Sequence, residues 1–289
     1  MKNIVEIKSL CKAYPNFELQ NVTFNVPGGS IVGFLGENGA GKTTTIKSIL
    51  GIVRPTSGNI SLFGQNHADN AVLAHSDIGM VFDECSFHDW LTAMQVGNIL
   101  KNVYSGWDDT YYKELLARFG LGALSKKNDK IKTYSRGMKM KLSLAAALAH
   151  RPKLLVLDEA TAGLDPVVRD EMLDLFLEFI RDEEHSILFS SHITSDVEKI
   201  ADYLVFIHQG KIVLNAEKDE LLARYAVVRC GYEQFSALEA EHTIGVRKSS
   251  FGVEALVDNR AQLRPGEDLV VEPATIDDII LFTIRGKSA

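Results

Sequence analysis

Residues 31–50 read IVGFLGENGAGKTTTIKSIL, and this stretch decides the fold. The segment Ile31–Leu35 is short and apolar, which is typical of a buried strand. Gly36–Thr43 fits the pattern G-x-x-x-x-G-K-[ST] at every position, and Thr44–Leu50 is typical of a helix. A glycine-rich loop between a buried strand and a helix is the setting in which this pattern binds phosphate groups. We therefore expect a nucleotide at this turn.

Each residue type in the loop has a physical role. Glycines let backbone N–H groups curl around phosphate oxygens without Cβ clashes, and the helix start presents the positive end of its dipole. We expect Lys42 to reach the β- and γ-phosphates of ATP, and the Thr43 hydroxyl to bind Mg²⁺. The residues predicted to surround the nucleotide are Gly36, Asn38, Gly39, Ala40, Gly41, Lys42, Thr43 and Thr44.

Strands and helices alternate outward from this loop, which predicts an α/β fold with a mainly parallel sheet, as in P-loop NTPases. We also expect an antiparallel β subdomain and an inserted helical subdomain at about 84–150 within a nucleotide-binding domain of residues 1–215. A small α+β C-terminal domain is expected over residues 216–289. The predicted strands include Val5–Leu10, Val22–Val26, Ile60–Phe63, Ile78–Phe82, Leu154–Leu157, Ser186–Ser190 and Tyr203–His208, and Met138–Ala149 is rich in strong helix formers.

Two carboxylates follow the buried strand Leu154–Leu157 directly. The carboxyl end of such a strand faces the crevice where α/β sheets bind ligands. Asp158 suits Mg²⁺, directly or through water, and Glu159 suits activation of an attacking water. An ordinary strand end with two solvated acids is the alternative, and the phosphate loop upstream favours the catalytic pair.

Composition limits the other possibilities. The net charge is −7 and the pI about 5.7, so a dedicated nucleic-acid binder is not expected. Cys11, Cys85 and Cys230 show no metal-ligand spacing, which favours a reduced, cytosolic chain. The longest nearly pure apolar run, near Leu142–Ala149, is far shorter than the about 20 residues that a membrane span needs. Action on a membrane would therefore require a partner.

The order of the motifs resembles the nucleotide-binding subunits of ATP-binding cassette (ABC) transporters over about residues 3–215. Tyr134–Met138 (YSRGM) is similar to the family signature LSGGQ, with Arg136 and Met138 in place of its first Gly and its Gln. The resemblance implies that Ser135 and Gly137 bind the γ-phosphate held by a second copy. The alternative is a serine that merely begins a helix.

Further motifs support the same resemblance. Asp165 belongs to a segment that looks like the D-loop, and His192 looks like the switch histidine that contacts the γ-phosphate. The implied catalytic residues are then Lys42, Glu159 and His192. Tyr14 stands where the family stacks an aromatic ring on adenine; an ordinary surface tyrosine is the alternative.

One position departs from the family pattern. The family usually has a glutamine that senses Mg²⁺ where this chain has Asp83. An acid can still reach the metal, directly or through water, so Asp83 joins Thr43 and Asp158 as an expected metal ligand.

The resemblance implies an ATP-hydrolysing subunit that forms a homodimer around Mg-ATP and drives a separately encoded integral membrane permease. It places the chain in the cytoplasm, peripheral on the inner face of the cell membrane. Pro273–Phe282 resembles the C-terminal helix of subunits in bacterial drug, bacteriocin and lantibiotic exporters, so export is the expected direction. Two alternatives stay open: a soluble ABC ATPase acting on ribosomes or DNA, and a nucleotide-gated regulatory module with weak catalysis.

Overall fold

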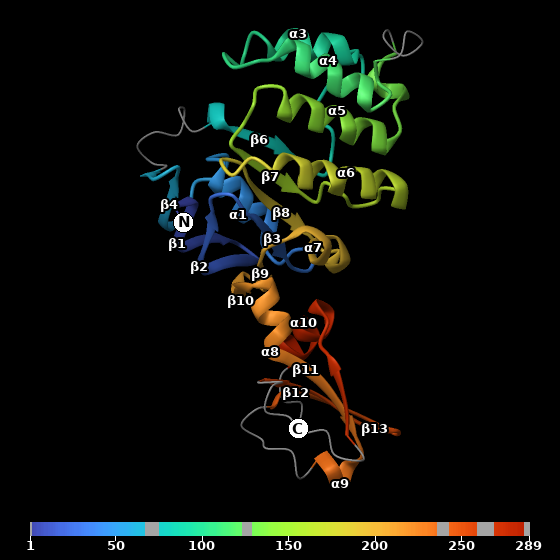
Figure 1. Ribbon diagram of the computed structural model, residues 1–289. Helices are drawn as coiled ribbons and strands as arrows, with labels where there is room; N and C mark the ends of the chain where they lie inside the picture. The colour runs from blue at the N-terminus through green and yellow to red at the C-terminus, as the bar shows by residue number, and fades with distance from the viewer. Residues whose placement is uncertain (1, 67–74, 123–128, 236–242, 259–268, 286–289) are drawn as a thin grey trace.

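The computed structural model describes residues 2–66, 75–122, 129–235, 243–258 and 269–285. Its elements lie in three tiers along an elongated molecule (Figure 1). The helices at one end are α3 (Ala93–Leu100), α4 (Asp109–Arg118) and α5 (Arg136–Leu148). The short turn η2 (Ile131–Thr133) precedes α5, and the short turn η1 (His75–Asp77) precedes a strand of the central sheet. A central sheet occupies the middle tier, and a separate C-terminal sheet forms the other end.

The central sheet has the strand order β10-β9-β3-β8-β7-β6. Strands β3, β6, β7, β8 and β9 pair in parallel, and β10 pairs antiparallel with β9 at one edge. Their bounds are β3 (Ile31–Leu35), β6 (Ile78–Val81), β7 (Leu154–Asp158), β8 (Ser186–Ser191), β9 (Tyr203–His208) and β10 (Lys211–Glu217). The predicted α/β class with a mainly parallel sheet is confirmed.

An antiparallel sheet of order β2-β1-β4-β5 packs against the central one. Its strands are β1 (Asn3–Tyr14), β2 (Phe17–Pro27), β4 (Ser57–Leu62) and β5 (Gln65–Asn66). Alternate residues of β2, such as Val22, Phe24 and Val26, are buried, as the two-residue period of a half-exposed strand requires. This is the antiparallel β subdomain expected from the sequence.

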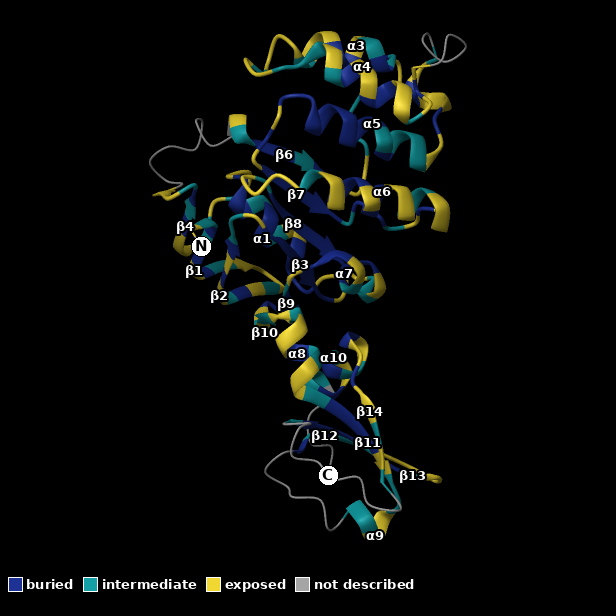
Figure 2. Cartoon of the chain, viewed as in Figure 1, coloured by how far each residue is buried: buried dark blue, intermediate teal, exposed yellow. Residues whose placement is uncertain are grey.

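The central strands are buried on both faces (Figure 2). Val32 and Phe34 of β3 pack with α1 (Lys42–Ile49) and the antiparallel sheet. Leu155 and Leu157 of β7 point the other way and pack with α5, α6 (Pro166–Phe179) and α7 (Thr194–Ile200). Because successive side chains of a strand point to opposite faces, the two continuous apolar runs build two separate cores. Helices α1 and α5 therefore lie on opposite sides of the sheet.

The C-terminal sheet is antiparallel and has the order β12-β13-β11-β14. Its region comprises α8 (Lys218–Arg224), β11 (Tyr225–Cys230), α9 (Tyr232–Phe235), β12 (Thr243–Ser249), β13 (Gly252–Asp258), β14 (Val270–Pro273) and α10 (Ile276–Arg285). Helix α10 buries Ile276, Ile279 and Phe282 against this sheet and also contacts α7. Lys218 donates from its Nζ to the carbonyl oxygen of Glu198, near the end of α7, at 3.0 Å. The region is thereby attached to the central tier.

Within the described part of the chain, no helix combines the length and the apolar character needed to cross a bilayer.

Candidate functional site

The phosphate loop connects β3 to α1 with backbone angles that need glycine. Gly39 and Gly41 have φ values of +82° and +115°, in the left-handed region. A Cβ atom at Gly41 would lie 2.5 Å from Leu19 Cδ2 and 2.9 Å from Phe17 Cζ. The close approach of Phe17 was not anticipated from the sequence. The end of the β1–β2 hairpin thus lies directly against the loop.

Lys42, the first residue of α1, points back over this loop. Its Nζ donates to the carbonyl oxygen of Gly36 at 2.5 Å and to that of Glu37 at 3.2 Å, and its side chain is buried. The first N–H groups of a helix have no acceptor within the helix, so those of α1 add to the same positive region. The loop therefore presents an ammonium group and backbone donors to an anion.

The residues predicted to be catalytic meet at this point. Glu159 Oε1 lies 3.0 Å from Lys42 Nζ, and Glu159 Oε2 lies 2.6 Å from His192 Nδ1. The Glu159 side chain is largely buried, whereas His192 is 44% exposed. The carboxylate is therefore held between a buried cation and a histidine that remains open to solvent.

Ser190 holds the acidic pair in place, and the sequence reasoning did not give it a role. It pairs with Asp158 across β7 and β8. Its hydroxyl donates to Asp158 Oδ1 at 2.6 Å, and its carbonyl oxygen accepts from the Glu159 N–H at 3.1 Å. A serine at the end of the neighbouring parallel strand was the available signal, but the strand register needed to use it was unknown.

Asp158 has an environment that favours a cation. Burial raises the pKa of its carboxyl, hydrogen bonds from Ser190 and Thr43 act in the opposite direction, and the charges of Glu159 and Asp83 raise the pKa further. The expected metal ligands Thr43, Asp158 and Asp83 are thus close enough to interact. Their donors are all oxygens, which suit Mg²⁺, and a divalent cation would offset the crowded negative charge.

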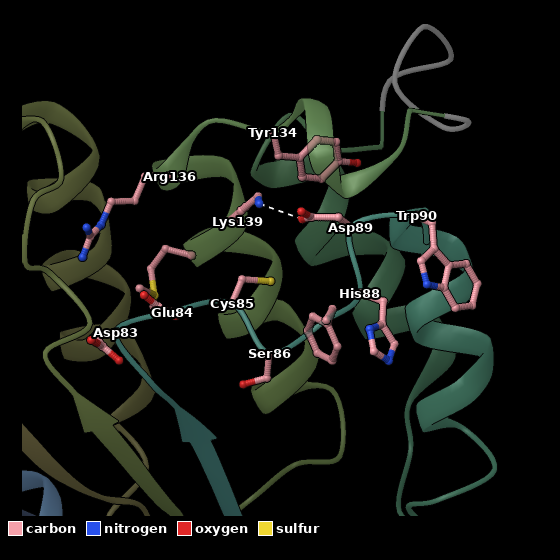
Figure 3. Close-up of a pocket in the computed structure, with 12 residues that line it drawn as sticks. Asp83, Glu84, Cys85, Ser86, His88, Asp89, Trp90, Tyr134, Arg136 and Lys139 are labelled. Atoms are coloured by element: carbon pink, nitrogen blue, oxygen red, sulfur yellow. Dashed lines mark hydrogen bonds and ion pairs between the residues drawn. The ribbon is translucent and has the colours of Figure 1, made fainter.

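Asp83 also borders a hollow of about 780 Å³ between the segment of residues 83–90, which follows β6, and the start of α5 (Figure 3). Phe87 and Trp90 line it from that segment, and Arg136 lines it from α5. Lys139 of α5 crosses its wall and forms an ion pair of 2.8 Å with Asp89. The hollow is therefore lined by both aromatic and charged side chains. One of them, Asp83, is also an expected metal ligand.

Ser135 and Gly137 are not brought to the phosphate loop of the same copy. Ser135 caps α5, and its Oγ accepts from the N–H of Met138 at 3.2 Å. Helix α5 packs on the face of the sheet opposite to α1. Both residues are accessible: Ser135 is exposed and Gly137 half-buried.

Tyr14 and Asp165 also lie at accessible positions. Tyr14 ends β1, is 43% exposed, and has Lys12 Nζ 5.4 Å from its ring centroid. It pairs across the β1–β2 hairpin with Phe17, the residue that approaches Gly41. Asp165 caps α6, where its Oδ1 accepts from the Val168 N–H at 3.1 Å.

Comparison with known proteins gives consistent matches. The family described as ABC transporter matches residues 19–162. The chain is 37% identical to the bacitracin transport ATP-binding protein BcrA of Bacillus licheniformis, over 78% of this chain and 73% of that protein. It is 36% identical to the lantibiotic transport ATP-binding protein SrtF of Streptococcus pyogenes, over 75% and 92% of the two chains. A solved structure of an ATP-binding subunit of an ABC transporter superposes with a TM-score of 0.67 and 28% identity, covering 82% of this chain and 95% of that one.

Proposed function

The chain belongs to the ABC transporter family as an ATP-binding and ATP-hydrolysing subunit, and we propose that two copies close around Mg-ATP to drive a separate membrane permease. The contact of Glu159 with both Lys42 and His192, beside the phosphate loop, carries this proposal. A base, a phosphate-binding cation and a histidine at one place are the parts that phosphoryl transfer to water needs.

In the hydrolytic step, Lys42 binds the β- and γ-phosphates of ATP and gives up its ion pair with Glu159. Glu159 then faces His192 and accepts a hydrogen bond, and later a proton, from the attacking water. His192 is exposed enough to contact the γ-phosphate and stabilises the charge that develops there.

Thr43, Asp158 and Asp83 would hold Mg²⁺, which supplies charge neutralisation at the phosphates when bound. Ser190 keeps Asp158 oriented toward that corner through its hydrogen bond of 2.6 Å. The hydroxyl of Thr43 already bonds to Asp158, so the donors are arranged before a nucleotide arrives.

The position of the signature residues supports dimerisation. Helix α5, which Ser135 caps, packs on the face of the sheet opposite to α1, and in the proposed dimer a second copy supplies Ser135 and Gly137 to the γ-phosphate. ATP then stabilises the closed dimer because both surfaces bind the same charge, and loss of phosphate reopens it. Tyr14 stacks on adenine, and Asp165 meets the partner copy.

The membrane partner fits the hollow beside Asp83, which touches both the metal corner and the helical subdomain of residues 84–150. The relatives' names refer to bacitracin and lantibiotic transport, which favours export of a peptide-like compound by a subunit on the inner face of the membrane. These names give no support to action on ribosomes or DNA. Residues 216–289 form an accessory domain in this proposal.

Glu159→Gln tests the proposal. We expect ATP to bind and to trap a dimer, while turnover falls by at least about 100-fold because the base is lost. Lys42→Ala should instead abolish ATP binding. Steady-state phosphate release, equilibrium nucleotide binding and light scattering measure the three effects. Full turnover by Glu159→Gln, or unchanged ATP binding by Lys42→Ala, would contradict the assigned site.

A further inference from the structure

A buried carboxylate that the hydrolytic step does not use lies just behind the site. Asp196 is 4% exposed and belongs to α7, four residues beyond His192. Burying a carboxylate is unfavourable unless it is paired and hydrogen-bonded. Its partners therefore indicate what it does.

Two side chains face Asp196 from different elements. The hydroxyl of Thr161 is fully buried beside the carboxylate, and among the described residues neither this hydroxyl nor Asp196 Oδ2 has a hydrogen-bond partner of normal length. Arg169 Nε, from α6, lies 3.9 Å from Asp196 Oδ2. Burial raises the pKa of Asp196, and the nearby Thr161 hydroxyl and the charge of Arg169 act against that rise. The buried carboxylate is thus only partly compensated, by one cation at 3.9 Å and one adjacent hydroxyl.

These partners connect Asp196 to the loop that begins at the catalytic base. Thr161 is two residues after Glu159 in sequence. Arg169 also donates from Nη2 to the carbonyl oxygen of Leu164 at 3.3 Å, one residue before Asp165. The segment between Glu159 and Asp165 therefore has Thr161 beside Asp196 near its start and Leu164 hydrogen-bonded to Arg169 at its end.

The same cluster is joined to the histidine. Helix α7 begins two residues after His192, and the Ile193 N–H between them donates to Ser191 Oγ at 2.9 Å. The loop carrying Glu159 and the turn carrying His192 are thus linked directly by the hydrogen bond of 2.6 Å, and behind the site Thr161 of that loop lies beside Asp196 of α7.

We propose that Asp196, together with Arg169 and Thr161, is a positioning residue that sets the placement of Glu159 relative to His192 and holds Asp165 where a second copy meets it. The inference rests on the proposed function of the Glu159 site. The cluster does not touch the phosphate loop, so it acts on turnover and leaves nucleotide affinity unchanged.

A purely structural link between α6 and α7 is the competing explanation, and the chain contains a matched control for it. Lys199 of α7 forms an ion pair of 2.5 Å with Asp170 of α6, the residue next to Arg169. That pair joins the same two helices at the surface. Lys199→Met therefore removes a link between the helices and leaves Asp196, Arg169 and Thr161 in place, since the Lys199 charge is the smallest of the effects on the pKa of Asp196.

The test compares Asp196→Asn, Arg169→Met, Thr161→Val and Lys199→Met in the full chain. We expect the three cluster variants to lower kcat by about tenfold or more, with KM and the ATP dissociation constant within about twofold of the parent. Asp196→Glu, which keeps the charge, should recover part of the lost kcat. Lys199→Met should match the parent. Rates are normalised to the folded fraction measured by thermal unfolding.

Three results would overturn the inference: unchanged kcat in the cluster variants, an equal loss in Lys199→Met, or a parallel loss of ATP affinity. If Arg169→Met fails to fold, kcat can still be measured for Asp196→Asn, because asparagine has nearly the same shape as aspartate. Failure of the proposed function is distinguishable, because the parent chain would then show no turnover, or ATP binding that does not depend on Lys42.

Discussion

At the scale of single residues, the site depends on a backbone that Glu159 would not adopt by itself. Its φ is +54°, in the left-handed region, where a residue with a side chain is held at a cost of about 1–3 kcal/mol. The Glu159 N–H donates to the Ser190 carbonyl oxygen, and the Ser190 hydroxyl holds Asp158. One serine therefore orients two carboxylates that point to different partners.

We predict that Ser190→Ala lowers the free energy of unfolding by about 1–3 kcal/mol, because the buried Asp158 carboxylate loses its hydrogen-bond donor. Turnover should fall as well, since Asp158 is no longer oriented. Denaturant unfolding and phosphate release measure the two effects.

Ser186→Ala is the matched control for that prediction. Ser186 lies in the same strand as Ser190 and is equally buried. Its hydroxyl oxygen accepts from the Gly29 N–H at 3.1 Å, away from the acidic pair. Ser186→Ala should cost some stability and leave turnover per folded molecule intact. Equal turnover in the two variants would show that Ser190 has no special role at the site.

At the scale of elements, His150 fastens the end of α5 to the central sheet. Its Nε2 lies 3.1 Å from the carbonyl oxygen of Ile78 in β6, and its ring stacks on Tyr104 at a centroid distance of 4.2 Å. Burial lowers the pKa of His150 below its usual value of 6.5. The folded protein thus keeps this ring neutral at pH values where the unfolded chain protonates it.

A pH dependence follows with a definite sign. Below about pH 6.5 the unfolded state binds a proton at His150 that the folded state does not, so stability decreases as the pH falls toward the lowered folded pKa. In His150→Gln this contribution is absent, and the free energy of unfolding should change less between pH 7.5 and about pH 5.5. Denaturant titrations at both pH values measure the difference. Identical pH slopes in the two proteins would exclude His150 as the source.

The elements that the sequence predicted well are those with a strong period or a motif. The run Leu154–Leu157 predicted its strand, and the glycine loop predicted a loop followed by a helix. Helix α5 begins at Arg136, two residues before the predicted start, and is capped by Ser135. Helix α8 and strand β13 were missed: α8 buries only Leu221, and β13 interrupts its alternation with three buried residues in a row. Neither pattern distinguishes a short element from a loop.

The contacts between elements were the part that sequence alone does not provide. Ser190 reaches Asp158 because of the register of β7 against β8, and Asp196 reaches Thr161 because of how α7 packs. Both depend on tertiary packing of residues that are more than 30 positions apart. The roles of Lys42, Asp158, Glu159 and His192 came from motifs, while their supporting residues became visible only in the fold.

At the scale of the whole molecule, the helical subdomain and the C-terminal sheet lie at opposite ends, with the nucleotide site between them (Figure 1). Ser135 is exposed on the helical subdomain, where a second copy can approach it. The C-terminal region is attached through α10 and Lys218 to α7, the helix that carries Asp196. The C-terminal region is therefore attached to the helix that begins two residues after His192.

Ser135→Arg should leave ATP binding to single copies intact and prevent ATP-dependent dimerisation, because a bulky cation replaces the serine proposed to meet the γ-phosphate of the other copy. Light scattering in the Glu159→Gln background, with and without Mg-ATP, measures this. Thr110→Arg adds the same group at an exposed position of α4 and should dimerise normally. Dimers of Ser135→Arg as abundant as those of Thr110→Arg would rule out the composite site.

The ion pair between Lys42 and Glu159 couples nucleotide binding to the availability of the proposed base. Without nucleotide, the Lys42 ammonium group proposed to bind phosphate and the Glu159 carboxylate proposed to activate water form an ion pair of 3.0 Å and neutralise each other. In the proposed cycle, ATP binding separates this pair, so nucleotide binding and release of the Glu159 carboxylate occur together. A subunit without nucleotide then has no carboxylate free to act as a base. The binding energy of ATP is correspondingly reduced by the pair it must separate. A subunit relieved of the Glu159 charge should therefore hold its nucleotide more tightly than the native one.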